Sequence, residues 1–313
     1  MEIETVVSSI LTMAAMILIG GLLSCRMPFT LERRQLLIAI IINVAMPCII
    51  LNGVFQTEID ANFLTLVLLI FLSSILINFF GVFLGWMAAR AMHVTPDKAK
   101  EIALLSGLGN TGFIGIPLCA ALFGPKGALL AAIFDAGLDF TIWTLGVMML
   151  QGQRGFNFRS LKALINIPMI SIFIGMLVAV FNVTPPKSVA NLAETLANLA
   201  SPLAMMYIGM LIPSMAKKKR TTALHHLSMP LIMKLLIFPV TIALLLHLLS
   251  LPLEVAQIII VQSTMPSLTL ASILFARYSR DEEYGATMTV FSTLASITTI
   301  PLMTMIGFYL LVK

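Results

Sequence analysis

Residues Ser106–Pro117 read SGLGNTGFIGIP and interrupt an apolar run that extends from about Ile102 to Phe123. The stretch contains four glycines and a proline, with Asn110 and Thr111 between them. In a helix interior, each glycine costs about 1 kcal/mol and each proline about 3 kcal/mol relative to alanine. A helix that only faces lipid gains nothing from such residues, whereas a span that breaks at membrane depth needs them.

Irregular backbone is tolerated inside a membrane only where protein or water satisfies its polar groups. Broken spans of this kind form the midplane sites of secondary transporters. The stretch therefore predicts a broken membrane span. Close packing of continuous helices through small residues is the alternative interpretation.

The composition supports a membrane protein. The chain has 313 residues, of which 59% are hydrophobic and 11% are charged. Soluble domains contain about 45–50% apolar and about 25% charged residues. A membrane-crossing helix needs about 20 mostly apolar residues, so the sequence predicts an all-α polytopic membrane protein with ten transmembrane helices in the lipid bilayer. The predicted spans are 5–23, 35–54, 62–90, 100–122, 127–151, 161–182, 190–212, 223–249, 254–276 and 284–311.

Loop charges test this topology independently. With the N-terminus outside, the 19 basic residues fall in cytoplasmic loops, except Lys126, Lys187 and Lys313 outside and Lys234 within a span. This bias follows the positive-inside rule, so we expect a multi-pass protein of the inner or plasma membrane with both termini outside. The net charge of +5 then reflects topology and gives no reason to expect nucleic acid as a partner. The run Lys217–Arg220 is a topology anchor or, alternatively, a regulatory patch for lipid headgroups.

Three features recur along the chain at offsets of about 155 to 158 residues. They predict two five-helix repeats, residues 1–153 and 154–313. An odd number of spans in each repeat makes the second run inverted relative to the first. The recurring pairs are Asn43-x-x-x-Pro47 with Asn198-x-x-x-Pro202, the break at Gly109–Thr111 with that at Thr264–Ser267, and the turn and restart at Gly127-Ala128 with that at Gly285-Ala286.

Broken helices four and nine would cross near the bilayer centre. Their N-terminal ends expose N–H groups with partial positive charge, and their C-terminal ends expose carbonyls. Such N-terminal ends attract a carboxylate, although a neutral polar substrate also fits. The candidate substrate-binding residues there are Gly109, Asn110, Thr111, Ser263, Thr264, Pro266 and Ser267.

Three ionisable residues lie inside predicted spans: Asp135, Asp139 and Lys234. A charge at the centre of a membrane helix costs at least about 2.5–3.5 kcal/mol. The aspartates are four residues apart and share one helix face. Lys234 therefore holds a substrate carboxylate, or an aspartate carries a coupled proton. The alternative is a structural ion pair between Lys234 and an aspartate.

The motif NTGFIGIPL at Asn110–Leu118, followed by Phe123-Gly124 and matched by Met265-Pro266-Ser267, resembles the auxin efflux carrier family. This family includes plant PIN transporters and bacterial carriers of dicarboxylates such as malate and malonate. Gly109 stands where the plant proteins have proline, and Gln151–Ser160 is a short loop. Both departures resemble a bacterial-type member and speak against auxin itself as the substrate.

The resemblance implies a fold like that of the NhaA antiporter and the bile-acid transporters. It implies a scaffold of spans 1, 2, 6 and 7, a transport unit of spans 3–5 and 8–10, elevator-like transport, and a homodimer. By the same resemblance, Asn110 is the crossing asparagine and Pro266 the crossing proline.

The leading functional prediction is therefore a carrier of a small organic anion. A membrane-embedded enzyme is a second class, but no HExxH, GxSxG or Walker motif occurs, so we expect no enzyme. A channel or sensor is a third class. The cysteines lack metal-ligand spacing, so no metal site or cofactor is expected. Transport coupled to H⁺, transport coupled to Na⁺ and facilitative uniport all stay open.

Overall fold

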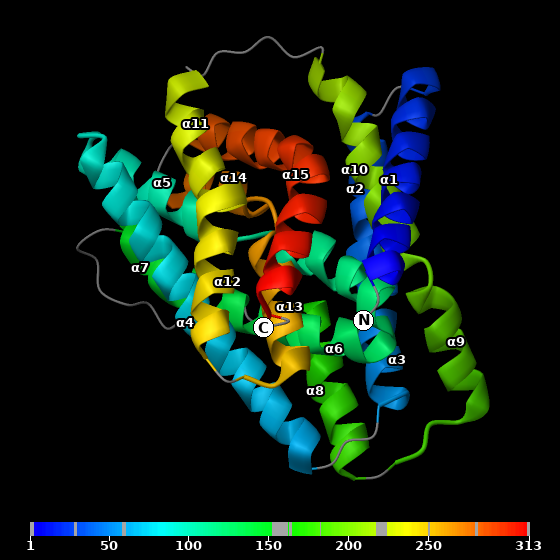
Figure 1. Cartoon of the computed structure of the whole chain (residues 1–313). Coiled ribbons are helices and arrows are strands. Elements are labelled where there is room, and N and C mark those ends of the chain that lie inside the picture. Colours follow the sequence, from blue (N-terminus) through cyan, green and yellow to red (C-terminus); the bar gives the residue numbers. More distant parts are fainter. Residues whose placement is uncertain are drawn as a thin grey trace. The chain divides into compact units, whose positions relative to one another are not determined.

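The structure is a computed structural model, and Figure 1 shows the chain. The run Lys217–Arg220 lies outside the residues that it describes. These residues are 3–27, 30–57, 61–151, 162, 165–181, 183–216, 224–249, 251–278 and 281–311. The α-helices are α1 (Ile3–Arg26), α2 (Leu31–Ile40), α3 (Met46–Phe55), α4 (Ala61–Ala91), α5 (Pro96–Gly107), α6 (Ile116–Thr141), α7 (Val147–Gln151), α8 (Ile167–Val180), α9 (Lys187–Ala197), α10 (Ala200–Ala216), α11 (Leu224–Ile232), α12 (Phe238–Leu248), α13 (Leu253–Ser263), α14 (Ala271–Tyr278) and α15 (Glu282–Leu311).

The predicted all-α fold is confirmed for the described part of the chain. Within it, 5 helical stretches are long and apolar enough to cross a membrane. Shorter apolar helices cover Ala14–Arg26, Ile167–Val180 and Leu253–Ser263. The five long stretches are Glu32–Phe55, Asn62–Ala91, Thr111–Gln151, Leu227–Leu248 and Glu282–Leu311.

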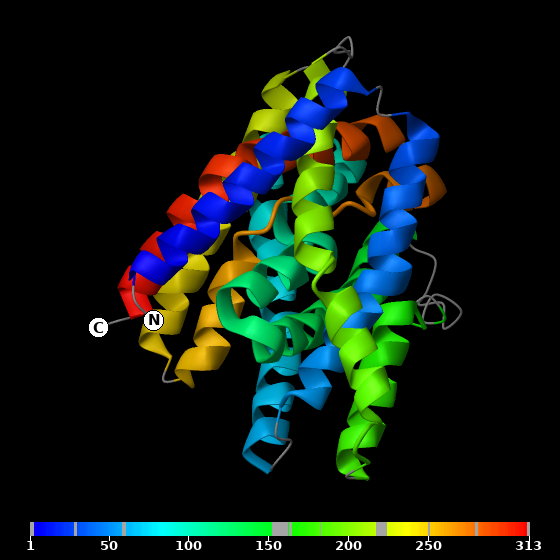
Figure 2. The same cartoon turned by 90° about the vertical axis from the view of Figure 1, so that its right-hand side faces the viewer.

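The chain forms two compact units. One comprises Met1–Val67, Gly112–Ile133 and Ile165–Lys219; the other comprises Leu68–Thr111, Phe134–Leu164 and Arg220–Lys313. In the first unit, α1 packs along α10 (Figures 1 and 2), and the Ser24 hydroxyl donates to Met210 O at 3.0 Å. The predicted grouping of spans into a scaffold and a transport unit stays a prediction.

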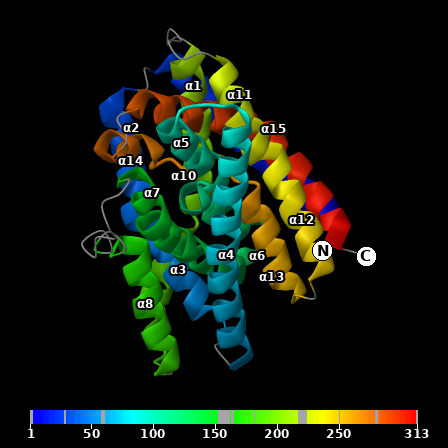
Figure 3. The same ribbon diagram turned by 90° about the vertical axis from the view of Figure 1, so that its left-hand side faces the viewer.

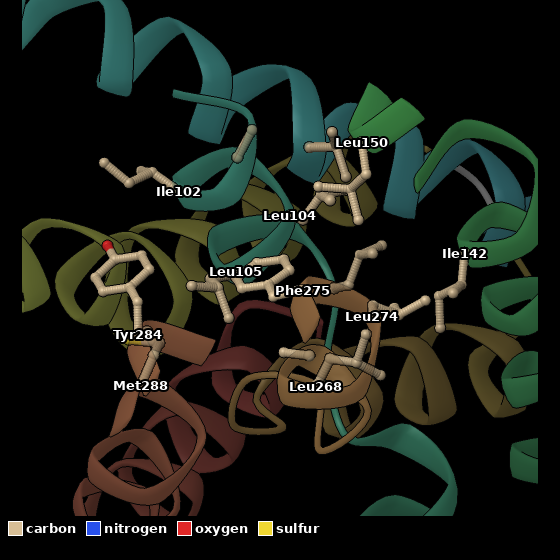
Figure 4. Packing of buried hydrophobic residues seen from close by; sticks show 14 of the residues in the cluster. Ile102, Leu104, Leu105, Ile142, Leu150, Leu268, Leu274, Phe275, Tyr284 and Met288 are labelled. Atoms are coloured by element: carbon tan, nitrogen blue, oxygen red, sulfur yellow. The ribbon is translucent and has the colours of Figure 1, made fainter. Parts of the chain in front are cut away.

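In the second unit, α12, α13 and α15 lie side by side (Figure 3). A hydrophobic cluster packs inside this unit, and the side chains labelled in Figure 4 include residues of α5, the π-helical turn η3 (Ile142–Gly146), α7, α14 and α15. Leu105 and Leu268 belong to this cluster; Leu105 lies just before the first interruption described below, and Leu268 lies within the second. Burial of such side chains stabilises the fold by about 1.5–3 kcal/mol each. The irregular backbone at the interruptions is therefore held against a packed apolar core.

The predicted turns and restarts at Gly127-Ala128 and Gly285-Ala286 are wrong, because both pairs lie inside helices. The first turn is at Gly124, where φ is +70° and ψ is −163°, and it divides α6 into two helical stretches. This left-handed conformation favours glycine, and Pro125 follows as a helix-starting residue. Near the other predicted turn, the Asp281 carboxylate accepts the Tyr284 N–H at 3.0 Å, and α15 starts earlier than expected.

Wide π-helical turns interrupt the described helices at η1 (Ile41–Ala45), η2 (Thr111–Gly115), η3 (Ile142–Gly146) and η5 (Met233–Ile237). Proline follows η1, η2 and η5 two residues later, at Pro47, Pro117 and Pro239. Proline has no N–H, and its ring clashes with the carbonyl four residues earlier. A wider turn relieves that clash without ending the helix. π-Turns inside helices often mark functional sites, and two of these turns carry candidate residues.

Candidate functional site

Two interruptions of helix meet in the second unit. α5 ends at Gly107 and helix resumes at Thr111, while α13 ends at Ser263 and α14 begins at Ala271. The two intervening segments pair like antiparallel strands at Gly109 and Ser267. The Asn110 N–H donates to Pro266 O at 2.7 Å, and the Leu268 N–H donates to Leu108 O at 3.2 Å. The structure thus brings together Gly109, Asn110, Pro266 and Ser267 from distant parts of the sequence.

A close helix contact fixes the end of α5. A Cβ added to Gly107 would lie 2.3 Å from Val82 N, and one added to Gly81 would lie 3.0 Å from Gly107 Cα. Only glycine permits this approach of α4 and α5. The interruption therefore begins where α5 lies against the backbone of its neighbour.

Hydroxyl groups at the end of α13 and in the second interruption donate to backbone carbonyls at the ends of the broken helices. Ser267 Oγ donates to Leu105 O at 2.7 Å, across the two interruptions. Ser263 Oγ and Thr264 Oγ1 donate to carbonyls one turn earlier in α13, at 2.7 and 2.8 Å. All three residues are at most 1% exposed. Their hydroxyl protons are therefore used in holding the backbone, which leaves these residues only lone pairs for a ligand.

Asn110 differs from these hydroxyl residues. It is 7% exposed, and its side-chain amide forms no hydrogen bond with any residue that the structure describes. An asparagine amide offers two donors and an acceptor. Buried polar groups are usually hydrogen-bonded, and those that are not call for a partner such as water or a ligand. Asn110 is therefore the neutral residue with the greatest unused hydrogen-bonding capacity at the pairing.

Lys234 places a cationic side chain against the same backbone. It lies on η5 and is 1% exposed, with Nζ 3.5 Å from Gly107 O and 4.4 Å from the centroid of the Phe238 ring. A Cβ added to Gly109 would lie 3.1 Å from Nζ. Among the described residues, no carboxylate forms an ion pair with Lys234. A buried cation with so few partners is costly, and an anionic ligand would offset that cost.

Asp135 and Asp139 lie on α6 and are half-buried. The Thr111 hydroxyl donates to Asp135 Oδ1 at 2.5 Å, so Asp135 is joined to the first interruption through a neutral neighbour. The alternative of a structural ion pair between Lys234 and these aspartates is not formed among the described residues. Lys234 and the two aspartates therefore form no direct ion pair within the described part of the chain.

Sequence reasoning missed two residues of α15 that contact the second interruption. The Ser267 N–H donates to Ser292 Oγ at 3.0 Å, and Thr289 Oγ1 donates to Leu268 O at 2.9 Å. One feature of the sequence could have indicated them: hydroxyl residues occur at positions 289, 292, 293 and 296, a spacing that places them on one helix face. The described residues contain no group of three or more His, Cys, Asp or Glu side chains that could hold a metal ion.

Comparisons with known proteins agree with a membrane transporter. The model of the membrane transport protein family matches residues 5–159 and 156–304. The chain is 23% identical to an uncharacterized transporter of Methanothermobacter thermautotrophicus over 296 residues, which cover 94% of this chain and 96% of that protein. It is 26% identical to an uncharacterized transporter of Methanocaldococcus jannaschii over 280 residues, which cover 87% and 89% of the two chains. With its apolar helices and its paired interruptions, this multi-pass chain belongs to the membrane transport protein family, the auxin efflux carrier family that its motif resembles.

Proposed function

We propose that this protein is a secondary carrier of a small organic anion, such as malate, malonate or an auxin-like carboxylate. The observation that carries the proposal is Lys234, a buried ammonium group without a carboxylate partner among the described residues, beside the paired interruptions. A carboxylate that enters there would find a cation and the unbonded amide of Asn110. A charge-assisted hydrogen bond is roughly twice as strong as a neutral one.

The backbone supports the same ligand class. Helix resumes at Thr111, so the first N–H groups of the restarted helix follow Asn110 directly. The N-terminal end of a helix favours negative charge. The helix start at Thr111 therefore favours negative charge directly after Asn110.

For the transport cycle, we propose ten spans arranged as two inverted five-helix repeats, with broken helices four and nine crossing. Transport would be elevator-like, in a homodimer of the plasma membrane with both termini outside. Asp135 is the proposed proton carrier, because its carboxylate accepts from Thr111 beside the interruption. Coupling to Na⁺ is the competing scheme, and dependence of uptake on a pH gradient or on Na⁺ distinguishes the two.

Uptake of radiolabelled malonate and malate by purified protein in liposomes tests the proposal. We expect saturable uptake that other small dicarboxylates inhibit, and no uptake by liposomes without protein. A current that does not saturate with anion concentration would indicate a channel, and conversion of the labelled compound would indicate an enzyme. Absence of uptake and of binding for a panel of mono- and dicarboxylates would contradict the proposal.

A further inference from the structure

The second interruption depends on a helix that contributes no predicted site residue. Within the second interruption, the segment from Pro266 to Leu268 is hydrogen-bonded to the first interruption on one side. There, Pro266 O accepts the Asn110 N–H and the Leu268 N–H donates to Leu108 O. On the other side lies α15, which provides an acceptor, Ser292 Oγ, for the Ser267 N–H. It also provides a donor, Thr289 Oγ1, for Leu268 O. Side chains of α15 thus occupy the place that a neighbouring strand would have in a sheet.

The two α15 contacts differ in how replaceable they are. Leu268 O also accepts the Ala271 N–H at 3.2 Å, so it keeps a partner if Thr289 is lost. The Ser267 N–H has Ser292 Oγ as its acceptor, and both residues are 0% exposed. A buried N–H without an acceptor is disfavoured, most of all inside a membrane. The hydrogen bond to Ser292 is therefore the one that the segment cannot replace with another local acceptor.

Ser267 transmits this constraint to the first interruption. While its N–H is held by Ser292, its hydroxyl donates to Leu105 O at 2.7 Å. A shift of Ser267 would disturb both that bond and the backbone pairing at Gly109. Asn110 follows Gly109 directly and donates its own N–H to Pro266. The position of the Asn110 amide thus depends on a hydroxyl group of α15 that does not touch it.

We propose that Ser292 is a positioning residue for the anion site, acting through Ser267 on the pairing that presents Asn110. The proposal has two parts. The effect of Ser292 on substrate affinity rests on the proposed function, whereas its effect on the conformation of residues 264–270 rests on the observed contacts alone.

Ser296 provides a matched control. Both serines lie on α15 four residues apart, are at most 2% exposed, and donate to the carbonyl three residues earlier, at 3.0 Å for Ser292 and 2.8 Å for Ser296. The two differ in their contact with the second interruption: among the described residues, Ser292 Oγ accepts the Ser267 N–H, and Ser296 forms no such bond. A general effect of removing a buried hydroxyl from α15 would appear in both alanine variants, whereas a positioning effect appears only in Ser292→Ala.

The test combines hydrogen exchange with uptake of radiolabelled malonate, using full-length protein in lipid nanodiscs and liposomes. In Ser292→Ala we expect faster amide exchange in peptides covering residues 264–270 and an apparent KM raised about tenfold with little change in maximal rate. Ser296→Ala is expected to behave as the unchanged protein in both measurements. Equal effects of the two substitutions, or unchanged exchange and KM in Ser292→Ala, would overturn the proposal.

Two further variants keep the test decisive if Ser292→Ala does not fold. Ser292→Thr keeps the hydroxyl group. Ser292→Val introduces a side chain with the shape of threonine but without the hydroxyl group. We expect the amides of residues 264–270 to stay protected from hydrogen exchange in the threonine variant and to exchange faster in the valine variant. Equal exchange rates in the two variants would overturn the proposal. If no protein in the series takes up malonate, the proposed function loses its support, and the exchange data alone decide the positioning role.

Discussion

Lys98 and Lys234 belong to the same unit of the structure, yet their surroundings are opposite. Lys98 Nζ lies 3.0 Å from Glu101 Oε2 and 2.5 Å from Asp281 Oδ2, and 3.3 Å from the centroid of the Tyr284 ring. Lys234 Nζ meets the carbonyl of Gly107 at 3.5 Å and the Phe238 ring, with no carboxylate partner among the described residues. The more buried lysine thus has the fewer counter-charges.

The different surroundings of Lys98 and Lys234 indicate different roles for the two side chains. Lys98 and its two acids join the start of α5 to the start of α15, so that its charge stabilises the protein itself. Lys234 is 1% exposed, and among the described residues its amine contacts a carbonyl and an aromatic ring but no carboxylate. Removing a partly exposed, paired lysine should weaken the fold, whereas removing a buried lysine with no acid should weaken anion binding.

The largest expected effect is that of Lys234→Met. Methionine keeps most of the length of the side chain and removes the charge, so we expect anion uptake to fall about 100-fold or more, as for a buried charge that pairs with a ligand. The melting temperature in detergent should stay the same or rise, because an uncompensated buried charge has been removed. Normal uptake by this variant would make Lys234 a packing residue and would end the contrast with Lys98.

Asn110→Ala should have the next largest effect, raising the apparent KM about tenfold through loss of a hydrogen bond to a charged ligand. Asn78→Ala is the matched control, because Asn78 is also buried, at 3% exposure, but its amide donates to Ser74 O at 2.8 Å. We expect Asn78→Ala to affect the melting temperature more than the KM. The reverse pattern would show that the unbonded amide of Asn110 is not a ligand group.

A smaller effect is expected for Thr111→Val. This change keeps the shape of the side chain and removes the donor to Asp135, a hydrogen bond whose loss corresponds to about a threefold change in apparent affinity or rate. Uptake measured with and without a pH gradient checks whether the change lies in coupling. If uptake of the unchanged protein does not respond to a pH gradient, Asp135 is not the proton carrier.

Lys98→Met should leave the KM within about twofold of the unchanged protein, while lowering stability by about 2 kcal/mol, since the buried Glu101 carboxylate loses its contact with the Lys98 ammonium group. The loss of stability is moderate because solvent screens the pair: the Lys98 and Asp281 side chains are 21% and 44% exposed. The double variant Lys98→Met/Glu101→Gln should recover part of that stability, measured by thermal unfolding. A raised KM with unchanged stability would reverse the assignment of the two lysines.

Much of the backbone plan could be predicted from local sequence. The glycines, Asn110 and Pro117 place an interruption within Ser106–Pro117, and the structure interrupts helix at 108–110. The second interruption begins at Thr264, where the recurring pattern places it. Local conformational preference decides these features, so one sequence is enough to find them.

The partners of each side chain could not be predicted in the same way. The hydroxyls of Ser263, Thr264 and Ser267 bond to backbone carbonyls, and Asp135 bonds to Thr111 instead of Lys234. These choices depend on which helices meet, and sequence spacing within one helix does not contain that information. The contact of Ser292 with Ser267 was missed for the same reason: it joins residues of two different elements.

The donors of the second interruption have a consequence for hydration. From Thr264 to Leu268, every N–H has a protein acceptor: Ile260 O, Gln262 O, Ser292 Oγ and Leu108 O receive them in turn, and Pro266 has no N–H to offer. This buried, non-helical segment can thus remain dry on its donor side even at the centre of a bilayer. A cargo that arrives there displaces no water from those amides, and so the desolvation cost of its entry falls on Asn110, Lys234 and the cargo itself.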